Sequence, residues 1–257
     1  MPHSSSNTPI EQLEADHTPQ AVRKRLADGP RHSYLRDFVY GAIDGAVTTF
    51  AVVAGVIGAQ LSPGVIVILG AANLFADGFS MAISNFLGTR ADQELREKVR
   101  RIERDQINRH PAGEREEIRQ IFAAKGFEGK DLERAVATIT SDVDRWIDTM
   151  LTEEHGVSLQ GPNPYRAAWS TFIAFVVIGS LPLLVFIYEI AAGVKVESAF
   201  AWSSLMTGVA FFIIGAGKSR FIGHKWWTSG LETLAIGAVA AAMAYYVGVL
   251  LRGVATV

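Results

Sequence analysis

The sequence predicts an all-α, polytopic membrane protein with five transmembrane helices and a helical domain between the second and third of them. Nearly half of the 257 residues, 49%, are hydrophobic. They fall in blocks of roughly 20 residues, the length of helix that crosses about 30 Å of hydrocarbon. Charged residues gather instead between Arg90 and His155, a stretch that holds 16 of the 26 acids and 13 of the 24 bases. Such separation of apolar and charged sequence is typical of a membrane protein with an inserted domain.

Residues 37–90 are predicted to form the first two transmembrane helices. The first runs from about Phe38 to Leu61 and the second from Val65 to about Thr89. Only the turn Ser62-Pro63-Gly64 separates them, and it contains no charge. Two apolar segments joined by so short a turn indicate a helical hairpin.

Residues 91–160 are predicted to form a helical domain outside the bilayer. Pro111 precedes one expected helix, Lys125-Gly126 closes it, and Ser141-Asp142 opens another. The pattern indicates about three helices, of which the first can continue the second transmembrane helix. Residues 161–257, which begin with a Gly- and Pro-rich linker, return the chain to the membrane.

The last three transmembrane helices are predicted from three runs without any charged residue. These runs are Ala167–Tyr188, Ser198–Gly217 and Thr233–Leu251. Buried helices of a soluble protein are the alternative, but three runs of this length in one chain favour membrane insertion.

Basic residues predict the orientation of the chain. They are frequent in the polar tail, residues 1–36, and in the loop between the fourth and fifth transmembrane helices. The positive-inside rule places both, and the charged domain, in the cytoplasm. We expect a bacterial inner (plasma) membrane rather than an organelle. The residues counted are Arg23, Lys24, Arg25, Arg31 and Arg36 in the tail, Lys218, Arg220 and Lys225 in the loop, and Lys195 and Arg252 on the opposite side.

Composition excludes several kinds of site. The net charge of −2 gives no indication of a nucleic-acid partner. The chain has no cysteine, so disulfides, thiolate metal sites and cysteine nucleophiles are excluded. A metal site would need carboxylate, imidazole, amide, carbonyl or thioether ligands.

Acidic residues inside the first two apolar segments are candidate transport residues. An ionised carboxylate in hydrocarbon costs about 3 kcal/mol, so Asp44 is expected to face a pathway or a partner, unless it lies near the interface and is solvated. Gly41 and Gly45 lie on either side of Asp44 in the sequence. They are four residues apart and therefore share a helical face, where another helix can approach closely. Asp77 and Met81 also share a face, and together they suit a borderline divalent metal, although Met81 alone would be an ordinary packing residue. The polar neighbours that favour a water-lined face are Asn73, Ser80, Ser84 and Asn85.

The charged domain contains a second group of candidates. Glu114 and Glu117 are three residues apart and can share a cation, although exposed glutamate pairs are common without one. Met150 and Glu154 form another carboxylate–thioether face. His155 follows Glu154, but a single surface histidine is more often solvated than bound to metal.

Several of these segments resemble the vacuolar iron transporter (VIT) family. The resemblance covers about residues 35 to 252 and is specific as a combination, although each segment alone is weak. The matching segments are Tyr40–Gly45, Asp77–Met81, Gly88–Ala91, Trp146–Met150 before Glu154, Gly230–Thr233 and Ile236–Ala238.

The resemblance implies a five-helix homodimer, with lipid around it, that exports Fe²⁺ from the cytosol in exchange for protons and often accepts Mn²⁺ or similar ions such as Zn²⁺ or Co²⁺. It implies no tightly bound cofactor and no enzymatic activity. Two departures affect the domain: Gln106 stands where the family often has a second glutamate, and Leu151 where it has a second methionine. The residues that the resemblance assigns to metal are Asp44, Met81, Glu103, Glu114, Glu117, Met150 and Glu154. Independently of the resemblance, the polar positions of Asp77, Asn73 and Asn85 in the second apolar segment make them candidate pathway residues.

Two other functions remain open from the sequence. The first is a membrane-attached di-metal carboxylate oxidase, which normally uses Glu-x-x-His pairs that this domain lacks. The second is a metal-sensing membrane protein without transport. An acid and a methionine inside the apolar segments argue against a sensor, and metal flux would separate the three functions.

Overall fold

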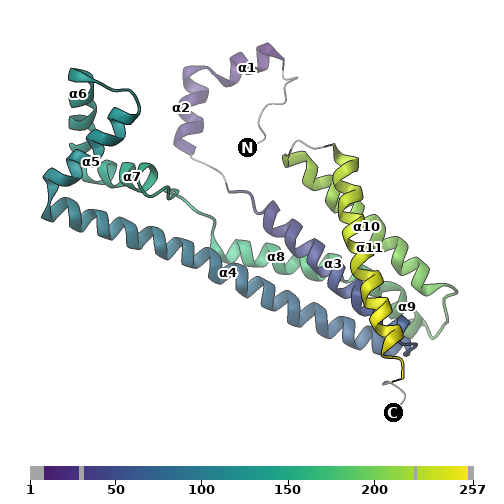
Figure 1. Ribbon diagram of the computed structural model, residues 1–257. Coiled ribbons are helices and arrows are strands. Elements are labelled where there is room, and N and C mark those ends of the chain that lie inside the picture. Colours follow the sequence, from purple (N-terminus) through teal and green to yellow (C-terminus); the bar gives the residue numbers. More distant parts are fainter. Residues whose placement is uncertain (1–8, 29–31, 223–224, 254–257) are drawn as a thin grey trace. The chain divides into compact units, whose positions relative to one another are not determined.

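The described part of the chain consists of helices joined by turns and loops, and it contains no strand (Figure 1). The computed structural model describes residues 9–28, 32–222 and 225–253, with the side chains of 220–222 excepted. Arg31 and the Arg220 side chain, which entered the orientation argument, lie outside the described residues. The chain divides into two compact units, Met1–Phe86 with Pro164–Val257, and Leu87–Asn163. We call them the membrane unit and the domain unit.

Among the described residues, five helices are long and apolar enough to cross a membrane, which agrees with the predicted number. The tail that precedes them contains two short helices, α1 (Ile10–Asp16) and α2 (Pro19–Asp28). The five candidate spans are α3 (Leu35–Gly58), α4 (Pro63–Arg109), α8 to α9 (Pro164–Ala192), α10 (Ala199–Ile222) and α11 (Trp226–Leu250).

Glycines let α3 pack closely against α8. A Cβ atom on Gly41 would collide with the backbone of Thr171, and one on Gly45 with the backbone of Phe175. Both pairs are four residues apart, so two turns of α3 lie directly on two turns of α8. This is the small-residue packing that membrane helices use, because lipid provides no hydrophobic force to bring helices together.

We expect Gly45→Ala to destabilise the membrane unit. The added methyl group meets backbone atoms that cannot move aside as a side chain could, and such overpacking costs about 1–3 kcal/mol. Thermal unfolding of the detergent-solubilised protein should show a lower Tm. Gly217→Ala in α10 is the matched control, because a Cβ atom there has no heavy atom within 4 Å. Equal Tm values for the two variants would contradict the close α3–α8 contact.

The third span is interrupted, although its sequence predicts one uncharged run. α8 (Pro164–Gly179) ends before a short 3₁₀ helix, η1 (Leu181–Leu183), which leads into α9 (Leu184–Ala192). Pro182 accounts for the change, because proline has no N–H to donate and its ring clashes with the preceding turn. Ser203 of α10 donates a hydrogen bond of 2.7 Å to the Pro182 carbonyl, which helps to satisfy the backbone at the break.

The domain unit has one apolar core built by four helices. α4 extends far beyond the apolar segment, as the sequence allowed, and α5 (Pro111–Ala124), α6 (Gly129–Thr140) and α7 (Val143–Glu153) follow it. Pro111 lies in the first turn of α5 rather than before the helix, a position where its missing N–H costs nothing. The core residues are Ile107, Ile118, Val136, Trp146, Ile147, Met150 and Leu151.

Candidate metal site

Two buried glutamates lie beside the core of the domain unit. Glu103 of α4 is 2% exposed and Glu114 of α5 is 5% exposed. The burial of both glutamates follows from helical spacing. Glu103 is four residues before the core residue Ile107, and Glu114 is four residues before the core residue Ile118. The apolar contacts that hold α4 and α5 together therefore also bury the two carboxylates.

The end of α7 brings two more side chains to Glu103. Consecutive residues on a helix point about 100° apart, so Glu154 and His155 would diverge if α7 continued. The helix ends instead, with Gly156 in the left-handed region at φ +63° and a hydrogen bond from Val157 N–H to the Leu151 carbonyl. His155 Nε2 then lies 2.8 Å from Glu103 Oε1 and 3.7 Å from Glu154 Oε2.

Glu103, Glu154 and His155 each offer a ligand atom, and these atoms all lie within 4.8 Å of one another. Glu117 is exposed but close enough to act electrostatically on Glu114 and Glu154. The domain unit therefore unites all four glutamates predicted in the charged domain and adds His155. We call these five residues the glutamate–histidine cluster.

Two carboxylate oxygens of the cluster lack the hydrogen bonds that buried carboxylates normally have. Glu103 Oε2 and Glu114 Oε2 are buried and have no hydrogen-bond partner among the described residues. Leaving a buried acceptor unsatisfied costs about 1–3 kcal/mol, and more for a charged group. A divalent cation would satisfy both oxygens and offset the repulsion between the carboxylates.

Burial is the main cause that raises the pKa of Glu114 to about 7, and the neighbouring carboxylates of Glu117, Glu103 and Glu154 add to it. Burial likewise raises the pKa of Glu154. Both effects follow from the cost of charge in a partly desolvated site that already holds negative charge. Without metal, Glu114 is therefore expected to keep its proton below about pH 7.

We predict that metal binding to the cluster releases a proton from Glu114 at pH 6 and releases little from it at pH 8. The metal needs the carboxylate, so below pH 7 it must displace the proton, and affinity falls by up to tenfold per pH unit for each proton displaced. Calorimetry of the solubilised protein in two buffers of different ionisation enthalpy measures this release. Glu114→Gln should lower it at pH 6. Proton release that is the same at pH 6 and pH 8 would contradict the assignment.

Other residues assigned to the domain site lie differently. Met150 is fully buried and belongs to the apolar core together with Leu151, so its role as a metal ligand stays a prediction. Gln106 is exposed on α4, one turn from Glu103. Glu153 points elsewhere, because its carboxylate pairs with Lys125 at 2.6 Å. Sequence alone had set His155 aside, although a histidine next to a predicted ligand was the signal that could have found it.

In the membrane unit, two acids on neighbouring helices lie near each other. Asp44 of α3 and Asp77 of α4 are both exposed on the single chain and close enough to interact electrostatically. Neither carboxylate has a hydrogen-bond or ion-pair partner in the described part of the chain. Met81, one turn after Asp77, is half-buried and packs against the apolar core of this unit. The structure thus brings the two acids together but gives Met81 a packing contact as well.

Polar side chains join α3, α4 and α8 on either side of these acids. Asn73 Nδ2 donates to Thr48 Oγ1 at 3.2 Å. Asn85 Nδ2 lies 2.9 Å from Asp37 Oδ1 and 2.8 Å from Thr171 Oγ1. Sequence reasoning missed Thr171, which lies in an uncharged run, and it did not consider Asp37. Both asparagines expected on the polar face therefore bond side chains of the membrane unit.

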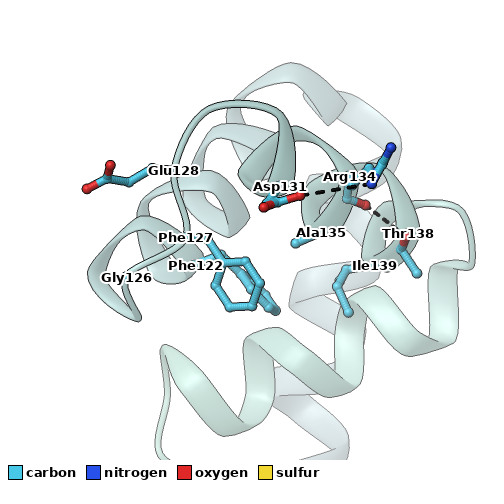
Figure 2. A pocket seen from close by; sticks show the side chains of 9 residues that line it. All are labelled: Phe122, Gly126, Phe127, Glu128, Asp131, Arg134, Ala135, Thr138 and Ile139. Atoms are coloured by element: carbon cyan, nitrogen blue, oxygen red, sulfur yellow. Dashed lines mark hydrogen bonds and ion pairs between the residues drawn. The ribbon is translucent and has the colours of Figure 1, made fainter.

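A pocket lies elsewhere in the domain unit, between the end of α5 and α6 (Figure 2). It has a volume of about 620 Å³. Phe122, Phe127 and Ile139 contribute apolar surface, whereas Asp131 and Arg134 pair with each other at 4.0 Å. None of the residues predicted to bind metal lines it, so this pocket is separate from the glutamate–histidine cluster.

Comparison with known sequences decides the family. A sequence model of the VIT family matches residues 35–249. The chain belongs to the VIT family. A VIT-family relative in Toxoplasma gondii, named vacuolar iron transporter, is 30% identical over 255 residues that cover 95% of this chain and 84% of the relative. Vacuolar iron transporter 1 of Arabidopsis thaliana is 32% identical over 214 residues, covering 82% of this chain and 83% of the plant protein.

A more distant VIT-family relative, the vacuolar iron transporter of Plasmodium falciparum, is 27% identical over 224 residues, with 85% of this chain and 82% of the relative covered. The family model begins with α3 and ends within the last turn of α11, so it covers residues of both units. Family membership and five apolar helices together identify an integral membrane protein.

Proposed function

We propose that this protein exports divalent metal, chiefly Fe²⁺, from the cytosol in exchange for protons. Its relatives are named iron transporters, and this chain contains candidate metal ligands in both units. The observation that carries the proposal is the pair of buried, unpartnered carboxylate oxygens of Glu103 and Glu114 beside His155 and Glu154. Mn²⁺, Zn²⁺ and Co²⁺ are further candidate substrates.

The domain unit captures the metal in this proposal. Its glutamates concentrate negative charge at a small site, which raises the local concentration of a hydrated cation. Binding there reduces the repulsion between carboxylates and provides a partner for the buried oxygens of Glu103 and Glu114. The metal-free site therefore favours binding of a cation. Fe²⁺ is substrate here, and no resident cofactor is required.

The membrane unit carries the metal across. An exposed acid inside an apolar helix cannot face lipid cheaply, so Asp44 and Asp77 are expected to face a water-filled path or another protein surface. A second copy of the chain supplies that surface, and the path then runs along a homodimer interface. Asp44 holds either a proton or the metal, which makes exchange of the two obligatory.

Lys218 lies in the last turns of α10 rather than in a loop, and Lys225 caps the start of α11. We further propose that the N-terminus, the domain unit and the connection from α10 to α11 lie in the cytoplasm of a bacterial inner membrane. The basic residues of the tail and beside that connection support this orientation. Export from the cytosol then requires that the domain unit meets the metal first, as its carboxylates suggest.

The geometry favours a transporter over a di-metal oxidase. Oxidases of that kind place Glu-x-x-His pairs in a bundle core, whereas this cluster has one histidine, directly after Glu154. A sensor would need no unpaired acids inside its membrane helices, yet Asp44 and Asp77 are present.

Metal flux into proteoliposomes tests the proposal. Purified protein is reconstituted with an internal Fe²⁺ or Mn²⁺ indicator, and the metal is added outside. A transporter should give a rising internal signal that depends on the protein. Metal binding without flux would favour the sensor, and metal-dependent O₂ consumption without flux would favour the oxidase.

A further inference from the structure

We propose that His155 is a direct ligand of the captured metal, through Nε2, and that it tunes the domain site toward Fe²⁺, Co²⁺ and Zn²⁺ over Mn²⁺. The inference rests on the proposed function, because it concerns the same cluster. It adds a nitrogen donor to a set of residues that otherwise offers carboxylate oxygens.

The distances fit a shared metal. Metal–ligand bonds to imidazole nitrogen and carboxylate oxygen are about 2.0–2.2 Å long, so two ligands of one ion lie about 3 to 4 Å apart. His155 Nε2 lies 2.8 Å from Glu103 Oε1 and 3.7 Å from Glu154 Oε2. An ion can therefore enter between the three groups with small side-chain movements.

Two buried carboxylate oxygens of the cluster have no hydrogen-bond partner in the described part of the chain, which favours binding of a cation. His155 occupies only one oxygen of Glu103, and Oε2 of the same carboxylate is buried without a partner among the described side chains. Glu114 Oε2 is in the same state. Surface hydrogen bonding by His155 would leave both oxygens unsatisfied, whereas a cation held by Glu103, Glu114 and His155 would satisfy them.

The backbone holds the imidazole at the cluster. His155 N–H donates to the Met150 carbonyl at 3.2 Å, and Gly156 turns the chain away directly afterwards. The side chain is about one-third exposed, so the ring retains a path to solvent from which a metal can arrive. Both features suit a ligand at the mouth of a site whose buried end is Glu103 and Glu114.

The nitrogen donor determines which metal ions gain the most binding affinity from His155. Imidazole suits Fe²⁺, Co²⁺, Ni²⁺ and Zn²⁺, whereas all-oxygen sites suit Mn²⁺, Mg²⁺ and Ca²⁺. Removing His155 should therefore cost Co²⁺ or Zn²⁺ affinity on the order of 10- to 100-fold, as loss of a metal-site residue commonly does. Mn²⁺ affinity should fall only about two- to threefold, because carboxylates remain.

The experiment uses the full chain in detergent, without a histidine tag, and titrates it with Co²⁺ and with Mn²⁺. Three variants are compared with the wild type: His155→Leu, which removes the nitrogen; His155→Asp, which replaces it with oxygen; and the control His110→Leu. His110 is the other histidine of the domain unit and lies at the start of α5, outside the cluster. His155→Leu should weaken Co²⁺ selectively, His155→Asp should restore Mn²⁺ but not Co²⁺, and His110→Leu should match the wild type.

A direct readout separates a ligand from a residue that only positions Glu103. Pulsed electron paramagnetic resonance of bound Mn²⁺ should show coupling to one imidazole ¹⁴N in the wild type and in His110→Leu, and none in His155→Leu. Absence of this coupling in the wild type would overturn the inference even if His155→Leu fails to fold. Equal loss of Co²⁺ and Mn²⁺ affinity in a folded His155→Leu protein would also overturn it. A wild-type protein that binds neither metal would instead refute the proposed function.

Discussion

Replacing Asp44 by asparagine is expected to abolish metal transport and to leave metal binding by the glutamate–histidine cluster unchanged. Asparagine keeps the size of the side chain but can neither hold the negative charge that attracts a cation nor exchange a proton. Asp44 lies on α3 in the membrane unit, and every residue of the cluster lies in the domain unit. Flux into proteoliposomes and calorimetric metal binding on the same preparation measure the two properties separately.

Glu189→Gln is the matched control for this variant. Glu189 also lies in a candidate span, but its Oε1 accepts a 2.8 Å hydrogen bond from Val196 N–H. Glutamine retains an acceptor oxygen for that bond, so transport should persist. Wild-type flux in Asp44→Asn would remove Asp44 from the pathway. Loss of flux in both variants would show only that these helices tolerate no loss of charge.

The apolar pattern is enough to predict the five helices, because about twenty consecutive, predominantly apolar residues have few alternatives to crossing a bilayer. The contact of Gly41 and Gly45 with another helix followed from their spacing, but its partner did not. Thr171 and Phe175 of α8 become neighbours of these glycines only after more than a hundred residues of chain have folded. Likewise, the sequence of the third span contains Pro182, but the effect of this proline on the helix depends on local backbone geometry.

The candidate metal site was harder to predict where it depends on the end of a helix. Glu103, Glu114 and Glu154 were assigned through a family resemblance, and the structure brings them together with Glu117. His155 is not predicted as a ligand from the sequence, because a single surface histidine is more often solvated than bound to metal. Helix α7 ends at Glu153 and Gly156 follows in the left-handed region, so helical spacing does not determine where the His155 side chain lies. Conversely, periodicity alone could not show that Met150 would be enclosed by the apolar core.

A proton gradient alone is expected to drive metal accumulation. If Asp44 binds metal and protons alternately, each inward step of one ion must be coupled to outward movement of the other. We consider vesicles whose lumen is acidic, whose outer face carries the domain unit, and whose metal concentration is equal on both sides. One pH unit stores about 1.36 kcal/mol per proton. At zero voltage, exchange of one proton per metal then supports about tenfold accumulation, and exchange of two supports about a hundredfold.

The measurement imposes the pH difference, clamps the voltage with potassium and valinomycin, and follows an internal Fe²⁺ or Mn²⁺ indicator. The accumulation ratio gives the number of protons exchanged, and Asp44→Asn vesicles should show no rise above protein-free vesicles. Acidifying the outer side instead should slow uptake, since protons then compete with metal for Asp44 and for Glu114, whose pKa is raised to about 7. A passive channel would equilibrate the metal but could not concentrate it under these conditions. An internal concentration that never exceeds the external one would therefore rule out antiport and leave a channel driven by the metal gradient and the membrane voltage.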